Sequence, residues 1–128
     1  MLTLLQVFEN HLNGSIPPEI GNLKSITTLS LGDNQLSGTV PISLGNLSSL
    51  KALTLRDNQF SGPIPQEIGN LTKLTALVLN TNHFTGFLPQ NLCQSRSLQH
   101  LSAYDNLLIG PIPKTLKTCT KPTLWEFI

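Results

Sequence analysis

Three histidines are the side chains in this 128-residue chain best suited to acid-base catalysis or metal binding. They stand at His11, His83 and His100, and the first two lie on turns about three units apart in a repeating pattern described below, so these two cannot share a metal ion. The sequence holds no G-x-S-x-G, Walker A, G-x-G-x-x-G or H-E-x-x-H motif, and no histidine is placed to activate its serines. We therefore expect no enzymatic activity, no metal site and no cofactor, and we interpret the histidines as solvated turn residues.

Several asparagines stand in acceptor sequences for N-linked glycosylation. The matches are Asn13-Gly14-Ser15, Asn46-Leu47-Ser48 and Asn70-Leu71-Thr72, with Asn91-Leu92-Cys93 as a weaker variant. Two of them also follow from a recurring G-N-L-[ST] segment, so the acceptor sequence alone does not establish a glycan. If the chain is secreted, we expect at least one of Asn13, Asn46 and Asn70 to be glycosylated.

Charge and hydropathy argue against two large classes of function. Eight Lys and Arg stand against seven Asp and Glu, and the net charge of +1 comes with no basic stripe for a nucleic acid. The longest aliphatic runs have about four residues, far short of the roughly 18 to 20 that span a bilayer. We see neither a signal peptide nor a transmembrane segment in this chain.

A 24-residue period organises the chain, because Asn10, Asn34, Asn58, Asn82 and Asn106 recur at that spacing without insertion. The period predicts a repeat domain over residues 2–121, followed by a divergent tail over residues 122–128. The five repeats are 2–25, 26–49, 50–73, 74–97 and 98–121.

Apolar residues fill the same positions of every repeat. Positions 1, 4, 6, 11, 15, 19 and 22 give 35 sites, and all are apolar except Ser95 if Ala103 and Cys119 are counted. One repeat is too small to bury these side chains, so they form a core only when neighbouring repeats stack. The segment L-x-x-L-x-L is typical of a short strand, and it predicts parallel strands near 4–7, 28–31, 52–55, 76–79 and 100–103.

Polar and turn residues predict the rest of each coil. The recurring Asn follows the strand, where its amide can pair with backbone groups that the turn leaves free, so we expect a structural ladder between coils. Gly at position 13 and the Pro that follows position 15 oppose a long helix. We therefore expect extended segments and short 3₁₀ turns on a convex side, opposite a concave sheet.

These features resemble a known class of repeat. The segments Leu36-Ser37-Gly38-Thr39-Val40-Pro41 and Phe60-Ser61-Gly62-Pro63-Ile64-Pro65 are similar to the L-x-G-x-I-P hallmark of the plant-specific leucine-rich repeat. The resemblance covers residues 2–121. It implies an α/β-type leucine-rich-repeat solenoid, a right-handed arc of five coils with a parallel sheet on the concave face and few helices. The stretches around Cys93 and Cys119 look more like the MDIS1-interacting receptor-like kinase group.

The resemblance also implies a location and partners. The class builds ectodomains of plant receptor-like kinases, which lie on the extracellular side of the plasma membrane, and secreted polygalacturonase-inhibiting proteins. The implied partner is a peptide ligand or another leucine-rich-repeat ectodomain. Family ectodomains begin with a signal peptide and a Cys-paired cap, whereas this chain enters the repeat at its second residue and carries no kinase motif. It therefore resembles an internal segment, from a longer receptor or from a truncated product.

Side chains of the concave face vary from repeat to repeat, as in a ligand-reading surface. Strands about 4.8 Å apart turn these columns into a mildly acidic patch over roughly 20 Å long, which suits an extended peptide. The candidate ligand-binding residues are Arg56, Asp57, Asn80, Tyr104, Asp105, Phe8 and Asp33. The alternative for the Asp column is turn chemistry before the ladder Asn. Relatives that bind a free carboxyl terminus use an Arg-x-Arg pair on this face, and here Arg56 stands alone.

Three interpretations of function remain open. A receptor module would bind a secreted peptide or a co-receptor on the concave face. A polygalacturonase-inhibitor-like protein would use the same face against a cell-wall hydrolase. The third interpretation is a remnant without a function of its own. The cysteine-containing fourth and fifth repeats favour the receptor.

Two further expectations concern the last repeats. Cys93 and Cys119 fall on adjacent coils, where stacking leaves about 5 to 7 Å between such positions, so we expect a disulfide. The alternative is two buried thiols. In the tail, Trp125 and Phe127 keep the strand register, which predicts a sixth strand near 124–127 with both rings over the end of the core.

Overall fold

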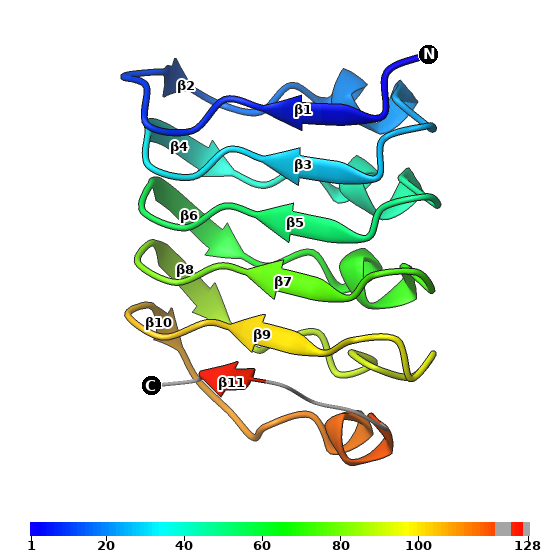
Figure 1. Ribbon diagram of the computed structural model, residues 1–128. Helices are drawn as coiled ribbons and strands as arrows, with labels where there is room; N and C mark the ends of the chain where they lie inside the picture. The colour runs from blue at the N-terminus through cyan, green and yellow to red at the C-terminus, as the bar shows by residue number, and fades with distance from the viewer. Residues whose placement is uncertain (120–123, 127–128) are drawn as a thin grey trace.

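The larger of two parallel sheets holds one short strand from each coil. The computed structural model describes residues 1–119 and 124–126, and it shows the coils stacked one below another (Figure 1). The strands of this sheet, in their order of pairing, are β1 (Leu4–Gln6), β3 (Thr28–Ser30), β5 (Ala52–Thr54), β7 (Ala76–Val78), β9 (His100–Ser102) and β11 (Leu124–Glu126). The five strands expected from the repeat pattern are confirmed, each ending one residue earlier than predicted.

The last strand, β11, pairs in parallel with β9, and the N–H of Ala103 donates to the carbonyl of Glu126 over 2.6 Å. The side chain of Trp125 and all of Phe127 lie outside the described residues, as does the expected boundary at residue 121. The predicted packing of the two rings and the predicted domain limits therefore stay predictions.

A second parallel sheet lies behind the first one (Figure 1). Its strands are β2 (Asn13–Gly14), β4 (Gln35–Thr39), β6 (Gln59–Pro63), β8 (His83–Gly86) and β10 (Leu107–Leu108). The sequence predicted only extended segments here. They pair because extended backbone stacked in register would otherwise leave its N–H and C=O groups without partners. Gly38 and Gly62 have φ of 77° and 73° in this sheet, a region that residues with a Cβ seldom adopt.

Short 3₁₀ helices close the other side of four coils. They are η1 (Pro18–Asn22), η2 (Ile42–Asn46), η3 (Gln66–Asn70) and η4 (Lys114–Thr118), and each follows a proline. In the fourth coil, residues 90–95 form turns instead, and Cys93 has a φ of 65°. The described residues contain no other kind of helix, which agrees with the glycine and proline spacing.

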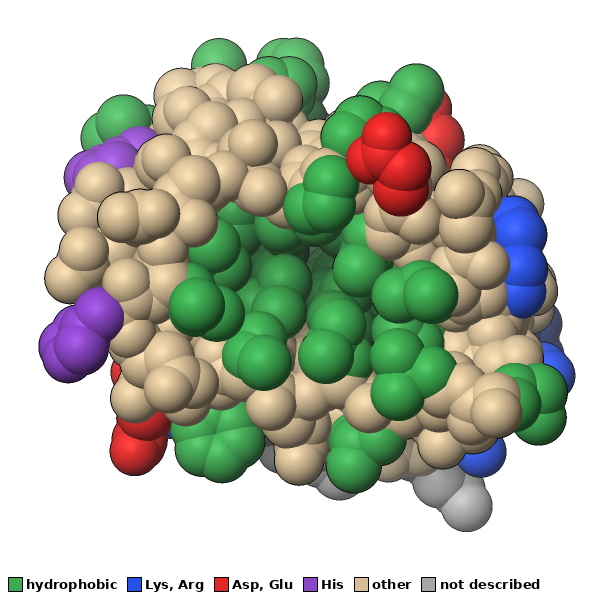
Figure 2. All heavy atoms as spheres, turned by 90° about the horizontal axis from the view of Figure 1, so that it is seen from above, with side chains coloured by type: hydrophobic (Ala, Val, Ile, Leu, Met, Phe, Trp, Pro, Cys, Tyr) green, Lys and Arg blue, Asp and Glu red, His purple; other side chains and the backbone are tan. Residues whose placement is uncertain are grey.

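The apolar positions form one continuous core. Every such position in the second and third repeats is buried, and the rings of Phe60 and Phe84 stack with centroids 6.1 Å apart. The end coils depart from the expectation, because Leu2, Leu12 and Ile112 are 48%, 43% and 56% exposed. The first coil has a neighbour on one side only, and beyond the fifth coil the described residues form only β11. Figure 2 looks onto the first coil and shows apolar side chains gathered inside a polar rim.

The recurring asparagines join each coil to the one before it. Asn58 is buried, and its Nδ2 donates to the carbonyls of Leu31, Leu55 and Arg56 at 2.9, 3.2 and 3.0 Å. Its Oδ1 accepts the N–H of Leu36 at 2.9 Å. Asn34, Asn82 and Asn106 make the corresponding contacts. One side chain therefore satisfies backbone groups of two coils at once.

The residue before each ladder Asn has a left-handed backbone. The column is Glu9, Asp33, Asp57, Thr81 and Asp105, with φ of 54°, 58°, 53°, 60° and 56°. Asp tolerates this region better than most residues with a side chain, whereas β-branched Thr does so poorly. The acidic character of this column is therefore accounted for by turn geometry.

Replacing Asn58 by Ala is expected to lower the free energy of unfolding by about 3 kcal/mol, because buried backbone groups of two coils lose their partners. Chemical denaturation followed by circular dichroism measures this change. The matched control is Asn10→Ala, since Asn10 is exposed and its side chain donates to the carbonyl of Phe8 within its own coil. Equal losses in the two variants would contradict the ladder's role.

Replacing Thr81 by Asp is expected to raise the free energy of unfolding by about 1 kcal/mol, because a β-branched residue leaves the left-handed region. The reverse exchange, Asp105→Thr, is expected to lower it by a similar amount. Thermal unfolding of both variants checks the pair, and a destabilised Thr81→Asp chain would show that side-chain contacts outweigh backbone strain here.

Candidate functional site

The outward side of the six-stranded sheet, called the strand face below, carries a shallow groove of about 320 Å³. Its floor consists of small side chains at the ends of strands β3, β5 and β7, which leave the sheet surface low between larger neighbours. The groove crosses all five coils and is lined by Phe8, Ser30, Gly32, Asp33, Thr54, Arg56, Val78 and His100. A peptide in an extended conformation can lie close to the sheet along such a floor.

An ion pair forms one side of the groove. Arg56 Nη2 lies 3.2 Å from Asp33 Oδ2, and Arg56 Nε lies 3.8 Å from Asp57 Oδ2. Gly32 gives Arg56 room, because a Cβ there would stand 3.1 Å from Arg56 Cγ and 3.3 Å from the Arg56 carbonyl oxygen, both closer than an ordinary contact. Arg56 therefore lies across bare backbone of the preceding coil, and two carboxylates offset its charge.

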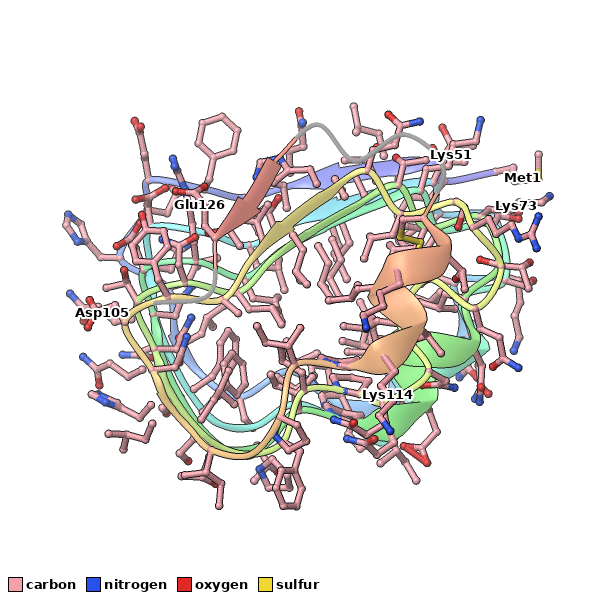
Figure 3. The ribbon with its side chains drawn as sticks, turned by 90° about the horizontal axis from the view of Figure 1, so that it is seen from below. Met1, Lys51, Lys73, Asp105, Lys114 and Glu126 are labelled. Atoms are coloured by element: carbon pink, nitrogen blue, oxygen red, sulfur yellow. A yellow bond between two sulfur atoms is a disulfide. The ribbon has the colours of Figure 1, made fainter. Side chains whose placement is uncertain are left out.

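The structure brings three of the seven candidate residues together at the groove, namely Phe8, Asp33 and Arg56. Asp57 touches it only through its contact with Arg56. Asp105 lies at the turn that follows the strands (Figure 3) and lines a separate hollow with Thr81 and Asn82.

Two of the predicted ligand-binding residues, Asn80 and Tyr104, do not line the groove. Asn80 is buried, and its Oδ1 accepts the hydroxyl of Ser102 at 3.2 Å while its Nδ2 donates to Thr81 Oγ1 at 3.3 Å. Its side chain is therefore occupied within the protein. Tyr104 is half-buried and does not line the groove.

Four groove residues lie on the face expected from the sequence but were not among the seven candidate residues, namely Ser30, Thr54, Val78 and His100. Ser30, Thr54 and Val78 occupy the outward position at the end of each short strand, and His100 occupies another outward position in β9. His100 is half-buried and lines the groove, so it is not the solvated turn residue that was expected. The period-2 alternation of the strand was the signal that marks these positions.

The cysteines form a covalent link between the last two repeats. Cys93 and Cys119 are joined by a disulfide with Cα atoms 5.7 Å apart, beside η4 (Figure 3). Neither cysteine is therefore a free thiol. Residues 1–119 and 124–126 contain no cluster of His, Cys, Asp and Glu able to hold a metal ion, and no helix long and apolar enough to cross a membrane.

These coils, asparagine ladders and parallel sheets define a solenoid with a grooved strand face. The leucine-rich repeat family matches residues 1–23, 25–47 and 49–71, and the chain belongs to that family. No curated protein matches the chain by sequence. Solved structures of plant receptor kinase ectodomains match it closely.

Three such structures illustrate the similarity. The SOBIR1 ectodomain from Arabidopsis thaliana is 35% identical, with a TM-score of 0.92 over 98% of this chain and 67% of its own. The GASSHO1/SCHENGEN3 ectodomain from Arabidopsis thaliana, in complex with CASPARIAN STRIP INTEGRITY FACTOR 2, is 39% identical, with a TM-score of 0.94 over 98% of this chain. PEPR1, in a complex with AtPEP1, is 40% identical, with a TM-score of 0.92 over 97% of this chain. This chain spans only 15% of the GASSHO1/SCHENGEN3 chain and 18% of the PEPR1 chain.

Removing the disulfide by Cys93→Ala with Cys119→Ala is expected to lower the free energy of unfolding by roughly 3 to 4 kcal/mol, because the unfolded chain regains the freedom of a closed loop. Denaturation with and without a reducing agent measures this effect. Reduction is expected to bring the wild-type chain down to the level of the double variant and to leave the variant unchanged. An unaffected wild-type chain would contradict a stabilising disulfide.

Proposed function

We propose that this chain is a non-catalytic binding module that recognises an extended peptide along the groove of the strand face. The observation that carries the proposal is the low floor formed by Ser30, Thr54 and Val78. This floor runs across the strands, and a peptide backbone can lie close to the face of the sheet along it. Phe8 offers an apolar contact at one end, and the pair of Arg56 with Asp33 offers polar groups beside the floor. Alternating side chains of an extended ligand would meet these groups in turn.

The module fits into a plant receptor-like kinase, as part of the ectodomain on the extracellular side of the plasma membrane. PEPR1 and GASSHO1/SCHENGEN3 support this proposal, because their structures contain AtPEP1 and CASPARIAN STRIP INTEGRITY FACTOR 2 respectively. The disulfide adds support, since such bonds persist in oxidising compartments. Within this class we favour the MDIS1-interacting receptor-like kinase group, on the sequence around Cys93 and Cys119. Another leucine-rich-repeat ectodomain is the alternative partner.

Filling the groove tests the proposal. Peptides are first selected on the wild-type chain from a phage-displayed library of short random sequences. Replacing Thr54 by Trp is expected to weaken their binding at least about tenfold, a change of roughly 1.4 kcal/mol, because the ring occupies the floor. Titration calorimetry with synthetic copies of the selected peptides measures the affinity.

The matched control is Gln59→Trp, which places the same ring on the exposed side of β6, in the other sheet. This control is expected to bind as the wild type does. Peptides that lose affinity equally in both variants, or in neither, would show that the groove is not the binding site. Inhibition of a polygalacturonase by the wild-type chain, without any selected peptide, would favour the inhibitor interpretation instead.

A further inference from the structure

The three acceptor asparagines differ in their surroundings. Asn13 lies in β2 and Asn46 ends η2, and both are exposed. Asn70 ends η3, is also exposed, and borders a shallow hollow of about 430 Å³ that is lined by residues of the third, fourth and fifth coils. Asn70 therefore combines an acceptor sequence with an open hollow at its side, lined mostly by polar residues.

The local geometry presents Asn70 for modification. Leu71 is buried and anchors the backbone, while Thr72, whose hydroxyl completes the acceptor sequence, is exposed. Asn91 Nδ2 donates to Asn70 Oδ1 at 2.8 Å. This bond uses the oxygen of the Asn70 amide, which a glycosylated asparagine retains as an acceptor, and it leaves the nitrogen that would carry the sugar.

The hollow is lined by groups that suit a sugar. Besides Asn70, its lining residues are Gln66, Glu67, Gln90, Asn91, Gln94 and Thr115. Some of their polar atoms bond to one another. Gln66 Oε1 accepts the N–H of Gln90 at 3.2 Å, and Thr115 Oγ1 donates to the carbonyl of Gln90 at 3.0 Å. Side-chain amides both donate and accept, as the hydroxyl and acetamido groups of an N-linked sugar require.

We propose that Asn70 carries an N-linked glycan whose first N-acetylglucosamine lies in this amide-lined hollow. The oligosaccharide comes from a lipid pyrophosphate donor. The bond from sugar C1 to the pyrophosphate oxygen breaks, a bond from C1 to Asn70 Nδ2 forms, Nδ2 loses one proton, and lipid pyrophosphate leaves. The glycan thereby covers the side of η3 and leaves the strand face open. This inference does not rest on the proposed peptide binding.

Secretion of the chain from mammalian cells behind a heterologous signal peptide tests the proposal. Glycopeptide mass spectrometry measures occupancy at Asn13, Asn46 and Asn70, and Thr72→Ala removes the Asn70 acceptor sequence without changing Asn70 itself. The folded protein is then treated with a glycan-specific amidase, and the rate of glycan release is measured at each occupied site. Release from Asn70 is expected to be about tenfold slower than release from Asn46, which corresponds to roughly 1.4 kcal/mol of sugar contact.

Two variants of the hollow separate sugar contact from simple crowding. Gln94→Ala removes an exposed amide of the wall, and Gln94→Glu keeps its size but removes its donors. Both are expected to bring the release rate at Asn70 close to that at Asn46, while thermal unfolding confirms that each variant is folded. An unoccupied Asn70 in the secreted wild-type chain would overturn the proposal, and so would equally fast release from both sites in that chain.

Discussion

Hydrogen bonding between coils is the constraint on which the rest of this structure depends. A 24-residue coil encloses too little volume to bury its own leucines, so its stability comes from its neighbours. The turn after each strand leaves backbone groups inside the stack, where unpaired N–H and C=O groups are costly. Asn58 meets this demand with a donor to Leu31 of the previous coil and an acceptor for the N–H of Leu36. The strands can then keep one register from end to end.

This constraint also explains at which positions the side chains can differ from coil to coil. Inward positions and the ladder Asn are fixed by packing and hydrogen bonding, whereas the outward positions of the strands touch nothing that every coil requires. Small residues there lower the floor at Thr54 and Val78, and Gly32 lets Arg56 lie flat against the preceding coil. The strand face can therefore acquire a specific shape without any change in the scaffold that supports it.

Sequence periodicity predicted the scaffold well because each element depends on local, repeating causes. The strands at Leu29, Leu53 and Leu77 follow from the alternation of apolar residues, which stacking then enforces. The second sheet was not predicted, because its pairing arises only when extended segments of neighbouring coils come together. Asn80 was expected to face a ligand, yet Ser102 of the next coil and its own neighbour Thr81 occupy its side chain. Contacts of this kind depend on the residue at the neighbouring position of the next coil, so they cannot be predicted from one repeat alone.

The central claim, that a ligand lies along the groove of the strand face, is tested most directly by mapping where a bound peptide sits. A peptide selected on the wild-type chain can carry a photoreactive residue at successive positions, and mass spectrometry then identifies the cross-linked residues. We predict cross-links to residues of the groove in β3, β5 and β7, moving from coil to coil as the photoreactive residue moves along the peptide. Cross-links confined to the second sheet or to the 3₁₀ helices would contradict the account.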